Sequence, residues 1–445
     1  MNVINLNEHR GQTTTLASIV RVGDFNQQFG NYHSLNLLSG KRAVIDAYNV
    51  SRQKDLIREL RANGYELILD TKGAELACPF KWSGQARKAE WLENGIQRAL
   101  AADSFNEKMA LRIAQLAVAG NFHVVLAPGR YVSESASILT LEQDYEFITL
   151  LRSALDSTGG ENIKVASSFI GRLTLLGQDT VTSRLMNLAK SSPIDSMWFR
   201  LSGLRRDPGP ARVRTTARRL HLLQEVGVPT VLDYAAGLEP LALLSLGAAS
   251  GLSFGALNSD QFKDDTWVKE SKFSNSAEDR GRRQYARAPG LGRNMSQAEL
   301  QLMSEAPRGK RLLLDPTNTG LTSFTDFKKK SKEIALTSTV QGIERLSETP
   351  NLRRTHLFKA EFLEPSANKA SQLAGLKLDP DRAKELNIKS PDGIGTRLQK
   401  YASSLTKTAH TLDVLTNEFG AQMPKPITLP HHGRSIMNSK SGKPQ

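Results

Sequence analysis

Charged side chains stand at or near the ends of short apolar runs in this sequence. Asp46, Asp70 and Asp233 each lie where such a run meets polar residues, Arg200 lies near the end of another, and Arg130 follows a further run closely. If these runs are parallel strands of a barrel, their carboxyl ends meet at the face that carries the chemistry. The set then predicts a polar pocket, whose arginines would suit an anionic substrate. Taken singly, each aspartate is better explained as a helix cap or as an ion-pair partner of Arg130 or Arg200.

The elements that must position these residues alternate between apolar runs and helical patterns. Helical spacing occurs at residues 55–60, 109–118, 147–155 and 217–226. Such alternation predicts a parallel sheet, and near-continuous apolar strands indicate burial on both faces. We therefore expect an α/β fold, a (β/α)8 TIM-type barrel over residues 1–260, with an open doubly wound sheet as the alternative. The strand candidates are residues 42–48, 65–70, 122–127, 163–169, 196–201, 229–234 and 251–257, and the eighth is either 15–22 or 311–315.

The rest of the chain differs in composition from the barrel region. Residues 261–295 are polar and charge-dense, which predicts a loop or insertion. Residues 296–420 carry helical patterns and many lysines, and Ser296 with Glu299 has the spacing of a capping box. Residues 421–445 are basic and proline-rich, and we expect them to be a disordered tail because they cannot bury enough apolar area to offset ordering entropy.

Charge and cysteine content restrict the classes of partner and compartment. Lys and Arg number 59 against 45 Asp and Glu, a formal net charge of +14. This excess favours nucleic acid, because each neutralised phosphate releases counterions, although a solubility charge is the simpler alternative. The single cysteine, Cys78, excludes an intramolecular disulfide and a cysteine-rich zinc site. Without a signal peptide or a convincing membrane span, we expect a cytoplasmic protein that makes no membrane contact. No P-loop, Rossmann fingerprint or HExxH motif occurs, so we expect no cofactor and no metal.

The segment LDTKGAEL, residues 69–76, combines a strand end with a turn that Gly73 would permit. It resembles the Asp-Ser-Gly-Gly-Phe-Glu/Gln-Leu signature of tRNA-guanine transglycosylases and their DNA-modifying relatives. By this resemblance Asp70 takes part at the base site, Thr71 matches the serine and Gly73 matches the second glycine. Lys72 and Ala74 depart from the signature, and a lysine at this position could contact a phosphate or plug the pocket.

Residues 234–257 resemble the late barrel unit of the same family. There the nucleophilic aspartate follows Ser/Met-Phe in the last strand, whereas here Ser253 and Phe254 are followed by Gly255. Asp233 and Asp260 are nearby candidates to replace it, although neither is in register. The zinc cysteines of the family are missing from residues 314–320, so His356, which resembles the family's zinc-binding histidine, is expected to be an ordinary helix residue.

The resemblance implies base exchange in tRNA or DNA, a pentosyltransferase reaction that replaces guanine by guanine or a 7-deazapurine. A carboxylate would attack the sugar C1′, with Asp70 and Asp233 as the catalytic candidates. Two alternatives remain: a non-catalytic nucleic-acid-binding subunit in a homo- or hetero-oligomer, and an unrelated barrel enzyme for a small anionic substrate. The expected substrate-binding residues are Asp46, Thr71, Lys72, Gly73, Arg130, Arg200 and Tyr234.

Arginines also cluster around a Pro-Gly-Pro loop after the fifth predicted strand. Guanidinium groups suit bidentate phosphate contacts, so this cluster predicts a nucleic-acid-binding surface, with a solvated charged face as the alternative. The cluster comprises Arg205, Arg206, Arg212, Arg214, Arg218 and Arg219.

Overall fold

The computed structural model describes residues 15–24, 26–78, 84–92, 105–133, 137–255, 261–268, 285–315 and 320–419. The tail predicted at residues 421–445 and the candidate Asp260 lie outside these ranges. A search of the described helices finds none with the length and hydropathy that a bilayer crossing requires.

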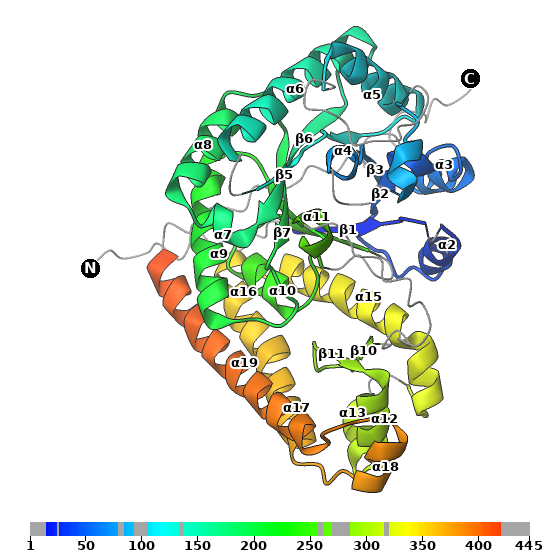
Figure 1. The fold of residues 1–445 in the computed structure, drawn as a ribbon, viewed down its shortest axis with the longest axis vertical. Coiled ribbons are helices and arrows are strands. Elements are labelled where there is room, and N and C mark those ends of the chain that lie inside the picture. The colour runs from blue at the N-terminus through cyan, green and yellow to red at the C-terminus, as the bar shows by residue number, and fades with distance from the viewer. Residues whose placement is uncertain are drawn as a thin grey trace, which may run out of the picture.

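Eight parallel strands close into a barrel surrounded by helices (Figure 1). Pairing of β1 with β9 and of β4 with β6 completes the ring. The predicted (β/α)8 barrel is therefore confirmed, and the open sheet is wrong. A short additional strand, β5 (Tyr131–Val132), extends the edge of β6. The barrel strands, in order around the ring, are β1 (Ala17–Arg21), β2 (Arg42–Asp46), β3 (Glu66–Asp70), β4 (Val124–Leu126), β6 (Lys164–Arg172), β7 (Ser196–Ser202), β8 (Thr230–Asp233) and β9 (Gly251–Gly255).

Helices follow the strands and cover the outside of the barrel. The helix α10 differs from the others because all of its residues are buried. It packs against α9 (Pro210–Leu223) on the barrel and against α15 (Phe324–Glu348) and α16 (Asn351–Phe358) of the C-terminal region, which explains why this stretch is almost uniformly apolar. The helices of the barrel region are α2 (Asn26–Ser34), α3 (Lys54–Ala62), α4 (Gly73–Ala77), α5 (Glu107–Ala119), α6 (Ser137–Ser157), α7 (Leu173–Leu176), α8 (Asp179–Lys190), α9 (Pro210–Leu223), α10 (Leu238–Ser245) and α11 (Asp265–Val268).

The barrel interior is organised by the alternation of side chains along each strand. Its central layer is apolar and includes Ile19, Val44, Ile68, Trp198 and Val231. Two residues further along the same strands, the inward positions at the carboxyl ends are Arg21, Asp46, Asp70, Arg200 and Asp233. The sequence period of two therefore delivers five charged side chains to one end of the barrel.

The C-terminal region is mainly helical, as predicted, and packs against the barrel through α10 and α9. Its long last helix runs along α9 (Figure 1), where the His221 and Phe419 rings stack with centroids 4.5 Å apart. The predicted capping box of Ser296 and Glu299 is confirmed at the start of α12. The helices are α12 (Gln297–Glu305), α13 (Gly309–Leu314), α15 (Phe324–Glu348), α16 (Asn351–Phe358), the π-helix η5 (Lys359–Leu363), α17 (Glu364–Ala374), α18 (Pro380–Glu385) and α19 (Asp392–Phe419).

The structure decides two points about elements that the sequence left open. Residues 311–315 are not a strand: most of them belong to α13, and the eighth strand is β1, within the other candidate range, 15–22. The stretch 261–295 is not only a loop, since its described part contains α11, β10 (Tyr285–Arg287) and the start of β11 (Asn294–Ser296). A short apolar run such as residues 312–314 is compatible with a buried helix as well as with a strand, and only packing separates the two.

Candidate functional site

A buried network of charged side chains fills the carboxyl-end layer of the barrel. Seven residues form it, and we call them the mouth cluster. Arg21, Asp70 and Asp233 lie at its centre, where the Arg21 guanidinium contacts both carboxylates. The full set is Arg21, Asp46, Asp70, Lys72, Glu75, Arg200 and Asp233.

Arg21 and Arg200 hold the two central carboxylates from different sides of the ring. Arg21 donates from Nη1 to Asp70 Oδ2 at 2.6 Å, and from Nε and Nη2 to the two oxygens of Asp233 at 2.8 and 2.9 Å. Arg200 donates from Nε to Asp233 Oδ2 at 3.0 Å and from Nη1 to Glu75 Oε1 at 3.0 Å. The bidentate contact of Arg21 fixes the orientation of the Asp233 carboxylate and favours its ionised form.

Lys72 extends the network to the third aspartate. Its ammonium lies 2.9 Å from Asp46 Oδ1 and 3.2 Å from Asp70 Oδ2, and it also contacts the Tyr234 hydroxyl at 3.0 Å. The Tyr48 hydroxyl donates to the other oxygen of Asp46 at 3.0 Å. The lysine that replaces a glycine of the signature therefore reaches into the cluster and binds its carboxylates.

The Tyr234 ring covers the two guanidiniums. The Cζ atoms of Arg21 and Arg200 lie 4.4 and 4.5 Å from its centroid, which is cation–π distance. Tyr234 adopts a left-handed backbone conformation with φ of 52°, which is uncommon for a residue with a bulky side chain. A strained residue that covers a charged cluster is typical of functional sites.

Burial and charge act in opposite directions on the aspartates. Burial alone would raise the pKa of Asp70, but Lys72, Arg21 and Arg200 outweigh it and hold the pKa well below its usual value. The pKa of Asp233 is lowered for the same reason, with Arg21 as the strongest opposing charge to burial. For Asp46 burial prevails over Lys72, and the pKa is raised. Asp70 and Asp233 are therefore carboxylate anions at neutral pH.

The turn after β3 is built by Lys72 and Gly73 in different ways. We expected Gly73 to supply the unusual conformation, but Lys72 has the positive φ, 60°. Gly73 is required for space instead, since a Cβ there would lie 2.4 Å from the Cβ of Pro128. Thr71 supports the same turn, because its hydroxyl donates to the Leu126 carbonyl at 2.9 Å.

Replacing Gly73 with alanine is expected to destabilise the fold by about 1–3 kcal/mol, the usual cost of overpacking. Gly30→Ala is the matched control, because a Cβ at that position in α2 meets nothing within 4 Å. The control should be neutral or stabilising by about 0.5–1 kcal/mol. Urea unfolding of both variants measures the difference, and equal stabilities would show that Pro128 moves aside without cost.

The structure gathers most of the predicted site residues and separates one. Asp46, Asp70, Lys72, Arg200 and Asp233 meet in the mouth cluster, with Tyr234 over them. Arg130 instead binds Asp144 at 2.7 Å, and its guanidinium lies 5.2 Å from the Phe105 ring centroid. Burial raises the pKa of Asp144 to about 6 although Arg130 opposes the rise. Arg130 therefore anchors α6 to the loop after β4.

Two residues of the mouth cluster were not identified from the sequence. Arg21 was missed because its strand was only one of two candidates, yet alternation puts it on the same face as Ala17 and Ile19. Glu75 occupies the Glu/Gln position of the signature in residues 69–76, and that match could have identified it. Glu75 lies in α4 and binds Arg200 from outside the ring of strands.

The predicted arginine surface is divided by ion pairs. Arg218 binds Glu418 at 2.7 Å, Arg219 binds Asp179, and Arg212 binds the fully buried Glu239 at 2.6 Å. These arginines of α9 therefore hold neighbouring helices together. Arg214 is exposed on the same helix.

A basic hollow of about 470 Å³ lies between the loop after β7 and the C-terminal region. Arg205 and Lys400 are exposed at it, whereas Arg293 is paired with Asp207 and Arg397 with Glu299. Because Arg205 and Arg206 follow a barrel strand, the hollow lies on the same side of the barrel as the mouth cluster. The charged residues that line it are Arg205, Arg206, Asp207, Arg212, Arg293, Arg397 and Lys400.

Comparison with known proteins adds no relative, since no family model matches this sequence and no curated protein matches it significantly. In the described part of the chain, no group of three or more His, Cys, Asp or Glu residues is arranged to hold a metal ion.

Proposed function

We propose that this protein acts on nucleic acid as a transglycosylase-like barrel, with the mouth cluster as the site for a guanine-like base. The observation that supports this is the convergence of Asp70, Arg200 and Asp233 with Arg21 at the carboxyl end of the barrel. Burying so many charges costs several kcal/mol per ion before pairing. Buried charged groups with shifted pKa values are more common at functional sites than elsewhere in proteins.

The cluster has the hydrogen-bonding groups that a guanine-like base needs. Guanine presents acceptors at O6 and N7 and a donor at N2, which guanidinium and carboxylate groups respectively satisfy. Arg200 Nη2 donates a long hydrogen bond of 3.4 Å to Asp70 Oδ2, and a base edge that displaced this contact would meet both groups. The base would have to be drawn out of its stack to reach a barrel mouth, and an aromatic residue such as Tyr234 commonly stacks on a base in that state.

In the proposed reaction a carboxylate attacks the sugar C1′ as the bond from C1′ to the base nitrogen breaks. The departing base takes up a proton from water, and the incoming guanine or 7-deazapurine then attacks C1′, gives its own proton to water and releases the carboxylate. Asp70 is proposed to hold the base and Asp233 to supply the carboxylate. The lowered pKa of Asp233 keeps it ionised, as a nucleophile must be, although Arg21 and Arg200 must yield for it to reach a sugar.

A second candidate function is binding without exchange. Gly255, where the resemblance places the nucleophile, pairs with Arg21 between β1 and β9 and contributes no side chain to the cluster. Asp70 and Asp233 are both engaged by arginines. These two observations favour a protein that recognises nucleic acid through the same surface but does not break the glycosidic bond.

One experiment separates these functions. Purified full-length protein is incubated with radiolabelled guanine and either tRNA or duplex DNA, and label retained on the polymer is counted; filter binding of the same polymers is measured in parallel. Retained label supports exchange. Salt-sensitive binding without label supports the second candidate. The absence of both retained label and binding would refute both candidate functions and would direct attention to small anionic substrates.

The basic hollow is expected to contact phosphates. Replacing Arg205 and Lys400 together with glutamine should lower the slope of log affinity against log salt by about 1–2, since each lost phosphate contact removes roughly 0.9. Arg218→Gln is the matched control because that arginine is already paired with Glu418. Filter binding across a salt series measures both. A larger effect from the control would move the interface to α9.

A further inference from the structure

A second pocket opens at the opposite end of the barrel, where the strands begin. Its volume is about 340 Å³, within the ~300–1,000 Å³ typical of small-molecule sites. It reaches into the barrel as far as Ile19, Ile68 and Trp198 of the central apolar layer. A TIM barrel usually fills this interior with bulky side chains, so an opening of this size is unusual.

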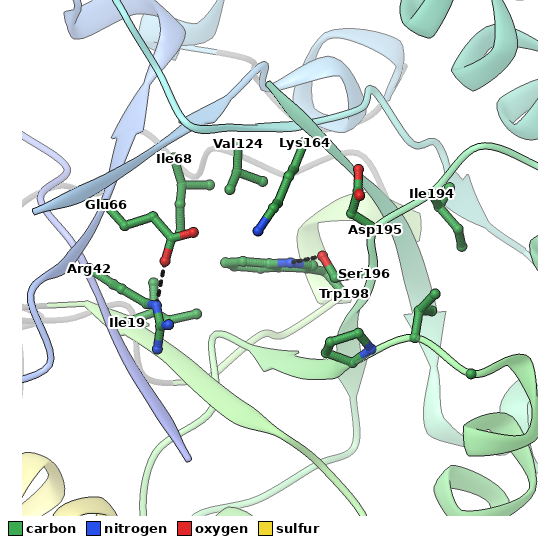
Figure 2. A pocket seen from close by; sticks show the side chains of 13 residues that line it. Ile19, Arg42, Glu66, Ile68, Val124, Lys164, Ile194, Asp195, Ser196 and Trp198 are labelled. Carbon is green, nitrogen blue, oxygen red and sulfur yellow. Dashed lines mark hydrogen bonds and ion pairs between the residues drawn. The ribbon is translucent and has the colours of Figure 1, made fainter. Parts of the chain in front are cut away.

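The pocket exists because the first inward layer is charged or small. In β2, β3, β6 and β7, the inward positions two residues before the central layer are Arg42, Glu66, Lys164 and Ser196. Arg42 and Glu66 are both buried and bind each other at 2.5 Å along one wall (Figure 2). This pair is electrically neutral and leaves the middle of the layer open.

Lys164 and Trp198 face each other across the opening. Figure 2 shows the lysine ammonium pointing toward the indole ring. Across the described ranges, no carboxylate forms an ion pair with Lys164. Asp195 also lines the pocket, but it is exposed, and one of its oxygens accepts a hydrogen bond from the Val165 amide at 2.8 Å. The indole is fixed by a bond from its Nε1 to Ser196 Oγ at 3.2 Å, which leaves the serine hydroxyl able to donate to a ligand.

We infer that this pocket binds a small planar monoanion, an aromatic or heteroaromatic carboxylate, with its ring on Trp198 and its carboxylate on Lys164 and Ser196. An indole face favours a flat ring. Arg42 and Glu66 bind each other, and the fourth charged residue of the lining, Asp195, is exposed and accepts the Val165 amide, so Lys164 is the cation placed to meet a bound anion. The site lies at the end of the barrel away from the mouth cluster, so the inference is independent of the proposed function.

Isothermal titration with benzoate and nicotinate tests this inference, with benzamide and cyclohexanecarboxylate as uncharged and non-planar comparisons. Both planar anions should bind, and each comparison should bind at least about tenfold more weakly, because it lacks either the charge or the flat ring. Lys164→Gln should weaken benzoate binding by about tenfold or more, because it removes a charge-assisted hydrogen bond.

Lys332→Gln is the matched control, since Lys332 is exposed on α15. Ser196→Ala tests the second donor with a smaller expected loss, and thermal unfolding confirms that each variant is folded. Absence of benzoate binding to the unmodified protein overturns the inference. An unchanged benzoate affinity in Lys164→Gln also overturns it, because the bound anion would then lie elsewhere. Equal affinity for benzoate and cyclohexanecarboxylate overturns it as well, because the ring would then not stack on Trp198.

Discussion

Replacing Arg21 with methionine is expected to destabilise the protein by about 3–5 kcal/mol, the usual cost of leaving buried charges without their partner. Arg21 is 3% exposed and contacts Asp70 and Asp233 at hydrogen-bonding distance, so the variant would leave both carboxylates to Arg200 and Lys72. Methionine keeps most of the side-chain volume and removes the charge. Urea unfolding at neutral pH measures the loss.

The pH dependence of this variant supplies an internal test. Asp70 and Asp233 have lowered pKa values in the folded protein, so their stabilisation is complete above the unfolded pKa of about 4 and is lost as the pH falls below it. The variant has less of this stabilisation to lose. The difference in unfolding free energy between the two proteins should therefore be largest near neutral pH and should shrink in acid.

Arg52→Met is the matched control for Arg21. Arg52 also binds an aspartate, Asp24, at 2.9 Å, but both side chains are about half exposed. Its loss should cost no more than about 1 kcal/mol, because water replaces the exposed partner. If Arg21→Met were as mild as the control, the mouth cluster would not be the tightly coupled network described above.

The second large effect concerns Asp70 and the proposed base exchange. Asp70→Asn should lower guanine incorporation by about a hundredfold or more, the usual effect of removing an essential charged group from an active site. The amide keeps the shape of the side chain but cannot accept two donors from the base edge and balance Lys72 as well. Single-turnover incorporation of labelled guanine is the measurement.

Asp144→Asn separates lost chemistry from lost stability. Asp144 is a buried aspartate paired with Arg130, outside the mouth cluster, so its replacement also removes a buried ion pair. We expect a comparable loss of stability and little change in incorporation per folded molecule. Full activity in Asp70→Asn would refute the role proposed for Asp70, and equal losses in both variants would assign the effect to folding.

Much of the barrel could be predicted from local patterns. Each strand candidate was a contiguous run, and a strand buried on both faces leaves such a run because every side chain contacts apolar neighbours. The same patterns placed Asp46, Asp70 and Asp233 at strand ends. Alternation then explains why these three, and Arg200, point inward together.

Other features depended on contacts between distant segments. Residues 15–22 and 311–315 are equally plausible strands in isolation, and β1 is the strand because it pairs with β2 and β9. The arginines of α9 look like one basic surface in sequence, but Glu239, Asp179 and Glu418 come from three other helices to neutralise Arg212, Arg219 and Arg218.

The sequence by itself determined the α/β class with a barrel favoured over an open sheet, seven of the eight barrel strands, and the aspartates at the strand ends. Only the tertiary structure decided which cations meet those aspartates, which arginines stay exposed, and that the opposite end of the barrel holds a pocket. The physical reason is separation along the sequence. The hydrophobic pattern of a strand or helix can be recognised within a few neighbouring residues, whereas ion pairs and cavities are formed by side chains as far apart in sequence as Arg21 and Asp233.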